Sequence, residues 1–128
     1  MRTSLVVAVA IALAACANAF AAPATSLSIT YSPEGLGGPR QTWTLRCSPT
    51  GGTHPRQVAA CRRLAQVVQP FRAVPAEAVC TQIYGGPDVA LVRGTFRGRR
   101  VWTYFRLRDG CEISRWQRVV PLLPARGA

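Results

Sequence analysis

Two stretches in the first half of the chain alternate apolar and polar residues with the period of a β-strand. Residues 26–31 alternate apolar side chains with hydroxyl residues, and residues 41–47 alternate again and end at Cys47. Because successive side chains of a strand point to opposite faces, both stretches predict half-buried strands. The glycine-rich and proline-rich residues 32–40 between them predict a loop.

A helical period follows this pair of strands. The segment Thr53-His54-Pro55 places a proline where the first turn of a helix tolerates one, and Pro70 marks the end, so a helix is predicted up to about Val68. The apolar positions on one stripe of this helix are Val58, Cys61, Leu64, Ala65 and Val68. We expect the stripe to face the core, where Cys61 can meet Cys47.

The second half of the chain predicts a loop and a β-hairpin. Residues 71–79 show weak periodicity, whereas residues 88–96 and 99–107 read as two strands joined by a tight Arg97-Gly98 turn. The second strand carries Val101, Thr103, Phe105 and Leu107 on one face and Trp102 and Tyr104 on the other. Apolar groups on both faces favour self-association through the sheet.

Residues 111–113 and 115–123 suggest one further short strand. The pattern as a whole predicts an α+β fold, an antiparallel sheet carrying one or two helices.

The first residues have the features of a targeting segment. Arg2 is followed by an uncharged run that is too short to span a bilayer, and small residues suited to cleavage come next. We therefore expect a signal peptide at 1–22 and a single domain at 23–128. The alternative is a bacterial lipobox at Leu13-Ala-Ala-Cys16, which would anchor the protein at the membrane through Cys16. Secretion is favoured because hydrophobic residues, and not a polar tether, follow Cys16.

The cysteine count fits export. Of the five cysteines, four remain when Cys16 is set aside, and an even number suits an oxidising compartment. Four cysteines allow three pairings, of which the sequence-local one, Cys47 with Cys61 and Cys80 with Cys111, is the simplest. No Cys-x-x-Cys pair exists and His54 is the single histidine, so neither a metal site nor a cofactor is expected.

The charge of the chain is strongly positive. Sixteen basic residues, all arginine, stand against five acidic ones, which gives a net charge of +11. The arginines are scattered singly or in pairs, and no nucleic-acid motif is present, so we expect solvated faces and no nucleic-acid partner. A basic module that binds polyanions, such as weak contact with anionic cell-wall polymers, is the alternative function. An enzyme is not expected, because neither a Ser-His-Asp set nor paired carboxylates can be placed.

A set of short motifs runs along the chain, and its members are Cys47 with Pro49, Gly52-Thr-His-Pro55, Ala60-Cys61, Leu64, Cys80 with Tyr84, Gly94-x-Phe-x-Gly98-x-Arg-Val101, Tyr104 and Cys111-Glu112. Together these motifs resemble the Streptomyces subtilisin inhibitor family of secreted serine-protease inhibitors. The resemblance implies a five-stranded antiparallel sheet with two helices and a homodimer built through the sheet. It also implies the disulfides Cys47 with Cys61 and Cys80 with Cys111, and an inhibitory loop just after Cys80.

The resemblance further implies the residues that contact a protease. By position, the reactive bond joins Gln82 to Ile83, and the other loop residues that touch the protease are Val79, Cys80, Thr81, Tyr84 and Gly85. The implied function is a secreted, substrate-like inhibitor of subtilisin-like serine proteases.

Three features in and beside this loop depart from the family pattern. Gln82 stands where methionine or a basic residue is common, and a neutral glutamine pairs with no buried carboxylate, so strong trypsin inhibition is not expected. Thr81 replaces a frequent proline, which removes one source of stiffness. The Gly85-Gly86 pair resembles a one-residue extension and predicts added flexibility.

Overall fold

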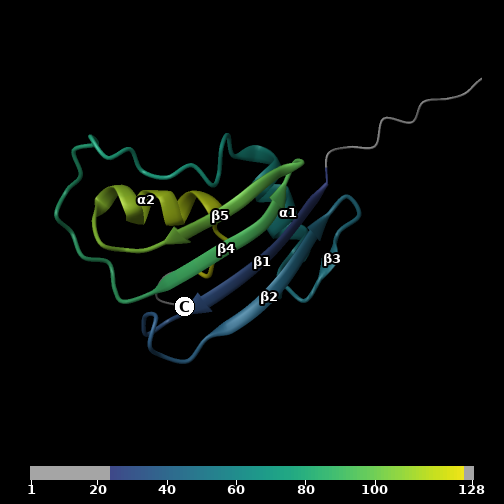
Figure 1. The fold of residues 1–128 in the computed structure, drawn as a ribbon, viewed down its shortest axis with the longest axis horizontal. Helices are drawn as coiled ribbons and strands as arrows, with labels where there is room; N and C mark the ends of the chain where they lie inside the picture. The colour runs from purple at the N-terminus through teal and green to yellow at the C-terminus, as the bar shows by residue number, and fades with distance from the viewer. Residues whose placement is uncertain (1–23, 126–128) are drawn as a thin grey trace, which may run out of the picture.

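The computed structural model describes residues 24–125, which form one antiparallel sheet with two helices packed against it (Figure 1). In chain order the elements are β1 (Thr25–Ser32), β2 (Gln41–Cys47), β3 (Gly51–Gly52), α1 (Gln57–Gln66), β4 (Val89–Phe96), β5 (Arg99–Phe105) and α2 (Gly110–Val119). The five strands lie in the order β3-β2-β1-β4-β5. The predicted α+β fold is therefore confirmed.

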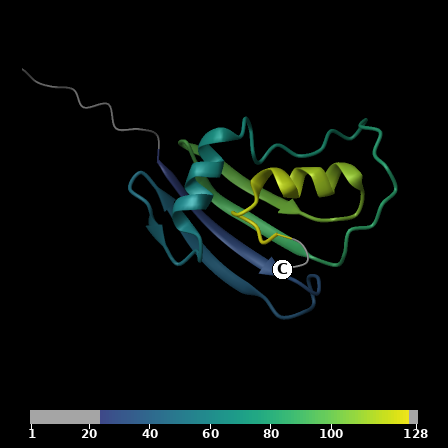
Figure 2. The same ribbon diagram turned by 180° about the vertical axis from the view of Figure 1, so that it is seen from behind.

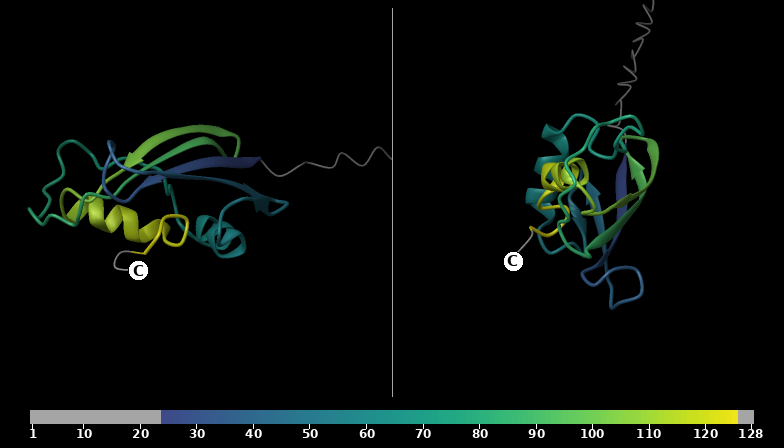
Figure 3. Two further views of the ribbon diagram at one scale, coloured as in Figure 1. Left: turned by 90° about the horizontal axis from the view of Figure 1, so that it is seen from below. Right: turned by 90° about the vertical axis from the view of Figure 1, so that its left-hand side faces the viewer.

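Both helices cover the same face of the sheet. The sheet lies in front of the helices in Figure 1, the helices lie in front of the sheet in Figure 2, and Figure 3 shows the two layers edge on. The apolar positions predicted for the first two strands face the helices: Leu27, Ile29 and Leu45 are at most 2% exposed. The opposite, helix-free face is bordered by no other element within residues 24–125.

The β4–β5 hairpin forms as predicted. Its turn residues Arg97 and Gly98 have φ angles of 49° and 80°, the left-handed backbone that two-residue hairpin turns require. The strand faces also divide as expected, because Phe105 is fully buried on the helix side while Trp102 is 66% exposed on the helix-free side.

The predicted apolar stripe of α1 is partly wrong. Val58 and Val68 are 63% and 77% exposed, and the residues that α1 buries are Ala60 and Leu64. The helix ends at Gln66, and the next residue is extended, so Val68 lies outside the helical period. A short helix lying on a sheet buries only a narrow row of its side chains.

The predicted strand over 115–123 is also wrong, because residues 110–119 form α2. Asp109 caps this helix by accepting a hydrogen bond from the Glu112 N–H at 2.9 Å. The fifth strand is instead β3, which the sequence pattern did not identify because its two glycines show no alternation. Backbone pairing with Leu45 and Arg46 of β2 defines this strand.

Two disulfides connect the helices to the rest of the fold. Cys47 at the end of β2 pairs with Cys61 of α1, and Cys80 pairs with Cys111 of α2, with Cα separations of 5.7 and 5.4 Å. This confirms the sequence-local pairing. The expected leader, 1–22 with Cys16, lies outside the described residues. Between residues 24 and 125, neither helix has the length and apolar character needed to span a bilayer.

His54 has a structural role at the start of α1. The side chain is 3% exposed, and its Nδ1 accepts a hydrogen bond from the Arg56 N–H at 3.0 Å. Nε2 then donates to the Leu122 carbonyl oxygen at 2.9 Å. Both ring nitrogens are therefore engaged, and the histidine ties the start of α1 to the C-terminal segment.

Candidate functional site

All the residues implied to contact a protease lie in one long connection, residues 67–88, between α1 and β4. This connection contains no helix or strand and passes along the outside of α2 before turning back at the end of the molecule (Figure 1). Long connections without secondary structure are unusual in small domains, and those that are held in place are commonly functional.

The middle of the connection is exposed. Val79 is 100% exposed, Ile83 58% and Tyr84 70%, although all three are large apolar side chains. Gln82 is exposed as well, which suits its polar, unbranched side chain. We call residues 79–84 the exposed loop. Exposed apolar side chains gathered on one short segment indicate a contact surface for another protein.

The first turn of helix α2 holds one side of the exposed loop. Besides the Cys80–Cys111 disulfide, the Gly110 N–H donates to the Thr81 carbonyl oxygen at 2.9 Å. A side chain at Gly110 would collide with Thr81 Oγ1. Glycine at this position therefore lets α2 approach the loop without displacing the Thr81 side chain.

The other side of the exposed loop is held by backbone packing at Gly85. Its N–H donates to the Leu107 carbonyl oxygen at 2.7 Å, and a Cβ added there would lie 2.9 Å from Ile113 Cδ1. Gly85 is buried, so the predicted flexibility is wrong for this glycine. Further along, Tyr31 of β1 donates its hydroxyl to Asp88 Oδ1 at 2.9 Å.

The same contacts act on the ionisation of Tyr31. Burial, followed by the hydrogen bond to Asp88 and the charge of that carboxylate, raises the pKa of Tyr31 to about 12. The phenol therefore stays protonated and able to donate at neutral pH.

Between these two fixed points the chain makes a tight turn centred on Gln82. The Ile83 N–H donates to the Thr81 carbonyl oxygen at 2.9 Å, which closes a three-residue turn. Gln82 Nε2 also donates to the Cys80 carbonyl oxygen at 3.4 Å. The exposed loop is thus bent at Gln82 and not uniformly extended, and the amide nitrogen of the Gln82–Ile83 bond is held from within the loop.

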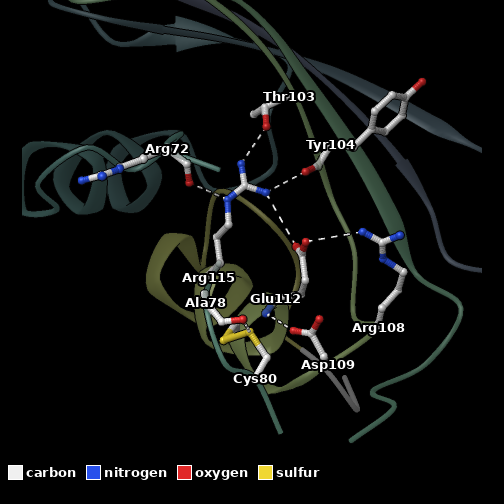
Figure 4. A network of polar contacts seen from close by, with 10 residues as sticks. Arg72, Ala78, Cys80, Thr103, Tyr104, Arg108, Asp109, Glu112 and Arg115 are labelled. Carbon is white, nitrogen blue, oxygen red and sulfur yellow. Dashed lines mark hydrogen bonds and ion pairs between the residues drawn. A yellow bond between two sulfur atoms is a disulfide. The ribbon is translucent and has the colours of Figure 1, made fainter. Parts of the chain in front are cut away.

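Arg115 of α2 fixes the segment that leads into the loop (Figure 4). Its side chain is 6% exposed, and its guanidinium donates to the carbonyl oxygen of Arg72 at 2.8 Å. A second hydrogen bond goes to the carbonyl oxygen of Phe71 at 3.3 Å. It also donates to the carbonyl oxygen of Tyr104 and to Thr103 Oγ1 of β5, both at 2.7 Å. One side chain of α2 therefore joins the segment before the exposed loop to the edge strand β5.

The surroundings of this guanidinium compensate for its burial only in part. Glu112 Oε2 lies 3.9 Å from Arg115 Nη1 and the Phe105 ring lies 3.9 Å from Cζ, while Glu112 also pairs with Arg108 at 3.7 Å. Burial lowers the pKa of Arg115, and the charge of Glu112 acts in the opposite direction. The group remains charged at neutral pH, because arginine starts from a very high pKa.

Side chains next to Arg115 hold the same segment. Arg118, also of α2, donates to the Val68 carbonyl oxygen at 3.0 Å. The Phe71 ring packs edge-on against Phe96 and Phe105, with centroids 5.1 and 6.4 Å apart. Residues 67–72 are thereby attached to both layers of the fold.

Sequence reasoning missed Arg115 because it placed residues 115–123 in a strand. The signal that was available is the spacing of Asp109 and Glu112, an acidic N-cap followed three residues later by glutamate, which predicts the start of a helix. Once a helix begins there, Arg115 lies one turn after Glu112 and on the same side.

One cluster of metal-ligand types occurs near the loop. The ligand atoms of Cys80, Asp109 and Cys111 lie within 4.8 Å of one another. The two sulfur atoms are bonded to each other, and the Asp109 carboxylate accepts the helix-capping hydrogen bond. A paired cysteine offers no thiolate, so this cluster is a disulfide beside a helix cap and not a metal site.

Comparison with known proteins identifies the family to which this loop-bearing fold belongs. The model of the family described as subtilisin inhibitor-like matches residues 21–106, which include the exposed loop and all five strands of the sheet. The chain belongs to the subtilisin inhibitor-like family. This confirms the resemblance drawn from the cysteine and Gly-Thr-His-Pro motifs.

Several Streptomyces relatives support the same assignment. This inhibitor-like chain is 35% identical over 96 residues to the subtilase-type protease inhibitor of Streptomyces coelicolor, a match that covers 63% of the chain and 66% of the relative. It is 41% identical over 79 residues to subtilisin inhibitor-like protein 5 of Streptomyces fradiae, covering 59% and 73%. These relatives are protease inhibitors, not enzymes.

A solved structure also matches. Streptomyces caespitosus sermetstatin, crystallised in complex with Bacillus licheniformis subtilisin, is 26% identical, with a TM-score of 0.46 and coverage of 71% of this chain and 89% of the other. Membership of the subtilisin inhibitor-like family rests on the sequence matches.

Proposed function

We propose that the chain is a secreted, substrate-like inhibitor of subtilisin-like serine proteases and that Gln82–Ile83 is its reactive bond. The observation that carries the proposal is the exposed loop, which presents Gln82 and Ile83 to solvent while Thr81 and Gly85 on either side are fixed to the fold. Family membership and the inhibitor names of the relatives support the same function.

Rigidity is the physical basis of tight binding in this proposal. A flexible peptide loses conformational entropy when it docks into a protease, at a cost of roughly 0.5–1.5 kcal/mol for each rotamer-rich side chain that is ordered. The exposed loop has already lost much of that freedom through the Cys80–Cys111 disulfide and the hydrogen bonds at Thr81 and Gly85. More of the contact energy is then expressed as affinity.

The same rigidity suppresses hydrolysis. The protease serine Oγ attacks the Gln82 carbonyl carbon, the bond to the Ile83 nitrogen breaks, and that nitrogen takes up a proton as it leaves. In a free peptide the new amine diffuses away and water completes the reaction. Here Ile83 is followed within two residues by the fixed Gly85, and its nitrogen already lies 2.9 Å from the Thr81 carbonyl oxygen. The amine stays near the acyl group and re-forms the bond.

Titration of subtilisin with the oxidised protein tests the proposal directly. We expect stoichiometric loss of protease activity, with slow cleavage confined to the Gln82–Ile83 bond on prolonged incubation. Mass spectrometry of the mixture identifies the bond that is cut. Rapid digestion without inhibition, or inhibition accompanied by cleavage at another bond of the loop, would rule out Gln82–Ile83 as the reactive bond.

Substitution of Gln82 is expected to change protease preference without changing stability. Gln82→Lys should create strong trypsin inhibition, which is not expected of the unmodified chain, because a lysine pairs with the carboxylate of a trypsin-like pocket. Gln82→Met should strengthen subtilisin inhibition by about tenfold, since an apolar side chain buries more surface in a broad pocket. Inhibition constants against both proteases measure this, and thermal unfolding should be unchanged because Gln82 is exposed. Identical preferences in all three proteins would show that Gln82 does not enter the specificity pocket.

Gly110→Ala tests the contact between α2 and the loop. The added methyl group collides with Thr81 Oγ1, so the Thr81 side chain must rotate or the loop must shift, and subtilisin inhibition should weaken by about tenfold. The matched control is Gly37→Ala, because a Cβ at Gly37 meets nothing within 4 Å. Equal inhibition constants for the two variants would mean that the position of Thr81 does not matter for binding.

Export and assembly belong to the same proposal. We propose secretion after removal of residues 1–22, leaving a single domain at 23–128, because two disulfides suit an oxidising compartment. The alternative, lipidation at Cys16, is decided by mass spectrometry of the mature N-terminus. The homodimer through the sheet stays a prediction, and its candidate surface is the helix-free face.

A further inference from the structure

A groove runs along α2, between that helix and the connection that carries the exposed loop. It has a volume of about 780 Å³ and we call it the α2 groove. One wall is α2, and the other is formed by residues of the connection between positions 68 and 81. No strand residue lines the groove, so it lies apart from the helix-free face that is the candidate dimer surface.

The two ends of the α2 groove are fixed by contacts between its walls. At one end the Gly110 N–H donates to the Thr81 carbonyl oxygen at 2.9 Å, and at the other Arg118 donates to the Val68 carbonyl oxygen at 3.0 Å. Gly110 and Arg118 are eight residues apart in α2, a rise of about 12 Å. The groove therefore begins at the exposed loop and continues along the helix for about two turns.

Two exposed arginines stand at the end of the α2 groove that is farther from the exposed loop. Arg118 contacts Val68, and Arg72 Nη1 donates to Gln69 Oε1 at 3.4 Å, so both guanidinium groups lie beside the same pair of residues. Figure 4 shows that the Arg72 side chain points away from Arg115, although its carbonyl group points toward it. The two groups therefore converge on one stretch of the connection.

Neither of these arginines has an acidic partner. Both ion pairs found among residues 24–125 involve Glu112, which pairs with other arginines, and none of the residues lining the groove is acidic. A guanidinium has five N–H donors, and Arg72 and Arg118 each use few of them within the fold. Donors in a planar fork, with no carboxylate beside them, are complementary to a carboxylate of another molecule.

The exposed loop by itself is small for a tight complex with a protease. Protease–inhibitor interfaces usually bury about 800 Å² on each partner and include roughly 20–30 residues a side. The exposed loop, residues 79–84, supplies a fraction of that number. The surfaces next to it must supply the rest, and the α2 groove is continuous with it because Val79, Cys80 and Thr81 belong to both.

From this continuity and charge we propose that the α2 groove is a second contact surface for the inhibited protease, in which Arg72 and Arg118 bind carboxylates on the rim of the protease cleft. The inference rests on the proposed inhibitory function and adds a determinant of target choice to it. The rim concerned is the one on the acyl side of the reactive bond, because the connection lines the groove before it reaches Gln82. Proteases with an acidic rim on that side are preferred over those without one.

A second copy of the chain fits the α2 groove less well. Three of the five acidic residues are already engaged within the fold, namely Asp88, Asp109 and Glu112. Glu34 and Glu77 are the two carboxylates left for a partner, and two chains that each carry a net charge of +11 repel one another. The complementary charge therefore comes from a different protein.

A double-mutant cycle tests the proposal. The probe is a subtilisin selected for carboxylates on the acyl side of its cleft, together with a variant in which those carboxylates are replaced by amides. The inhibitor variant combines Arg72→Gln and Arg118→Gln. The matched control combines Arg56→Gln and Arg62→Gln, two exposed arginines of the α1 region whose loss changes the net charge equally. Inhibition constants are measured for every combination at low salt.

The expected result is a loss of affinity that depends on both partners. Against the carboxylate-bearing protease, the variant lacking Arg72 and Arg118 should inhibit about tenfold more weakly, because two rim ion pairs are lost. Against the amide protease it should stay within about twofold of the unmodified protein, as should the control against both proteases. About 0.5 M salt should reduce the tenfold difference to less than about threefold, since it screens exposed charges.

A conservative variant separates charge from structure. Arg72→Lys combined with Arg118→Lys keeps both charges and should inhibit within about threefold of the unmodified protein. Equal weakening of the glutamine variant against both proteases would show that the arginines act by holding the connection, and would overturn the proposal. So would unchanged inhibition, or a dimer in sedimentation that the glutamine variant dissociates. Failure of the unmodified protein to inhibit either protease would overturn the proposed function as well, whereas strong inhibition without coupling would overturn this inference alone.

Discussion

Replacing Cys80 and Cys111 together by serine is expected to turn the inhibitor into a substrate. Without the covalent link between the exposed loop and α2, Thr81 is held to the helix by a single hydrogen bond from Gly110. The segment before Gln82 can then leave the fold, and after acylation the two new chain ends can separate. Subtilisin should cleave the variant rapidly at Gln82–Ile83.

The expected magnitudes are large. Closing a loop with a sequence separation of 31 residues stabilises the fold by about 3–4 kcal/mol in the chain-entropy model, and this is lost in the variant. Subtilisin inhibition should weaken by at least about 100-fold, which corresponds to about 2.7 kcal/mol of binding free energy. Inhibition constants and chemical unfolding measure the two losses separately.

The other disulfide supplies the matched control. Replacing Cys47 and Cys61 by serine removes a link with a sequence separation of 14 residues and should cost about 3 kcal/mol of stability. Because this link joins β2 to α1, far from the loop in sequence, inhibition by the folded variant should change by less than about threefold. If both double variants inhibit equally well at a temperature where both are folded, the loop does not need its covalent link.

Arg115→Met is expected to have the second largest effect. The substitution leaves the carbonyl oxygens of Arg72 and Tyr104 and the Glu112 carboxylate without their buried donor. Removing one partner of a buried charged network typically costs about 3–5 kcal/mol. The segment that leads into the exposed loop should detach from β5, so that hydrogen exchange at residues 71–72 accelerates and subtilisin cleaves the loop faster.

Two further variants separate this effect from general destabilisation. Arg118→Met removes an exposed arginine that also donates to a backbone carbonyl of the same segment, and it should cost less than about 1 kcal/mol. Arg115→Lys keeps the charge but loses the planar fork, so it should retain the fold with intermediate loop protection. If Arg115→Lys is as unstable as Arg115→Met and loop cleavage is unchanged in both, Arg115 serves the core alone and does not hold the loop.

The features that the sequence by itself determined are those whose signals are local. Alternation at Leu27, Ile29 and Leu45 specified two strands, and a tight Arg97-Gly98 turn specified the hairpin. The short spacing from Cys47 to Cys61 favoured the disulfide that forms. The exposure of Gln82 also follows from the local sequence, because burial of its polar amide would remove hydrogen bonds to water. In each case neighbours in sequence carry the whole pattern.

Other features were decided only when distant segments met. Residues 110–119 place Ile113, Trp116 and Val119 at the spacing of one helix face, but so short a pattern also suits a strand, and the Asp109 cap together with burial of Trp116 and Val119 decides for the helix. Gly85 looked flexible in sequence, yet contact with Leu107 and Ile113 fixes it. In the sequence Arg115 looks like one more surface charge, whereas in the fold it is buried against the carbonyl oxygens of Phe71, Arg72 and Tyr104. Long-range packing, which no local period encodes, therefore determines how the exposed loop is held.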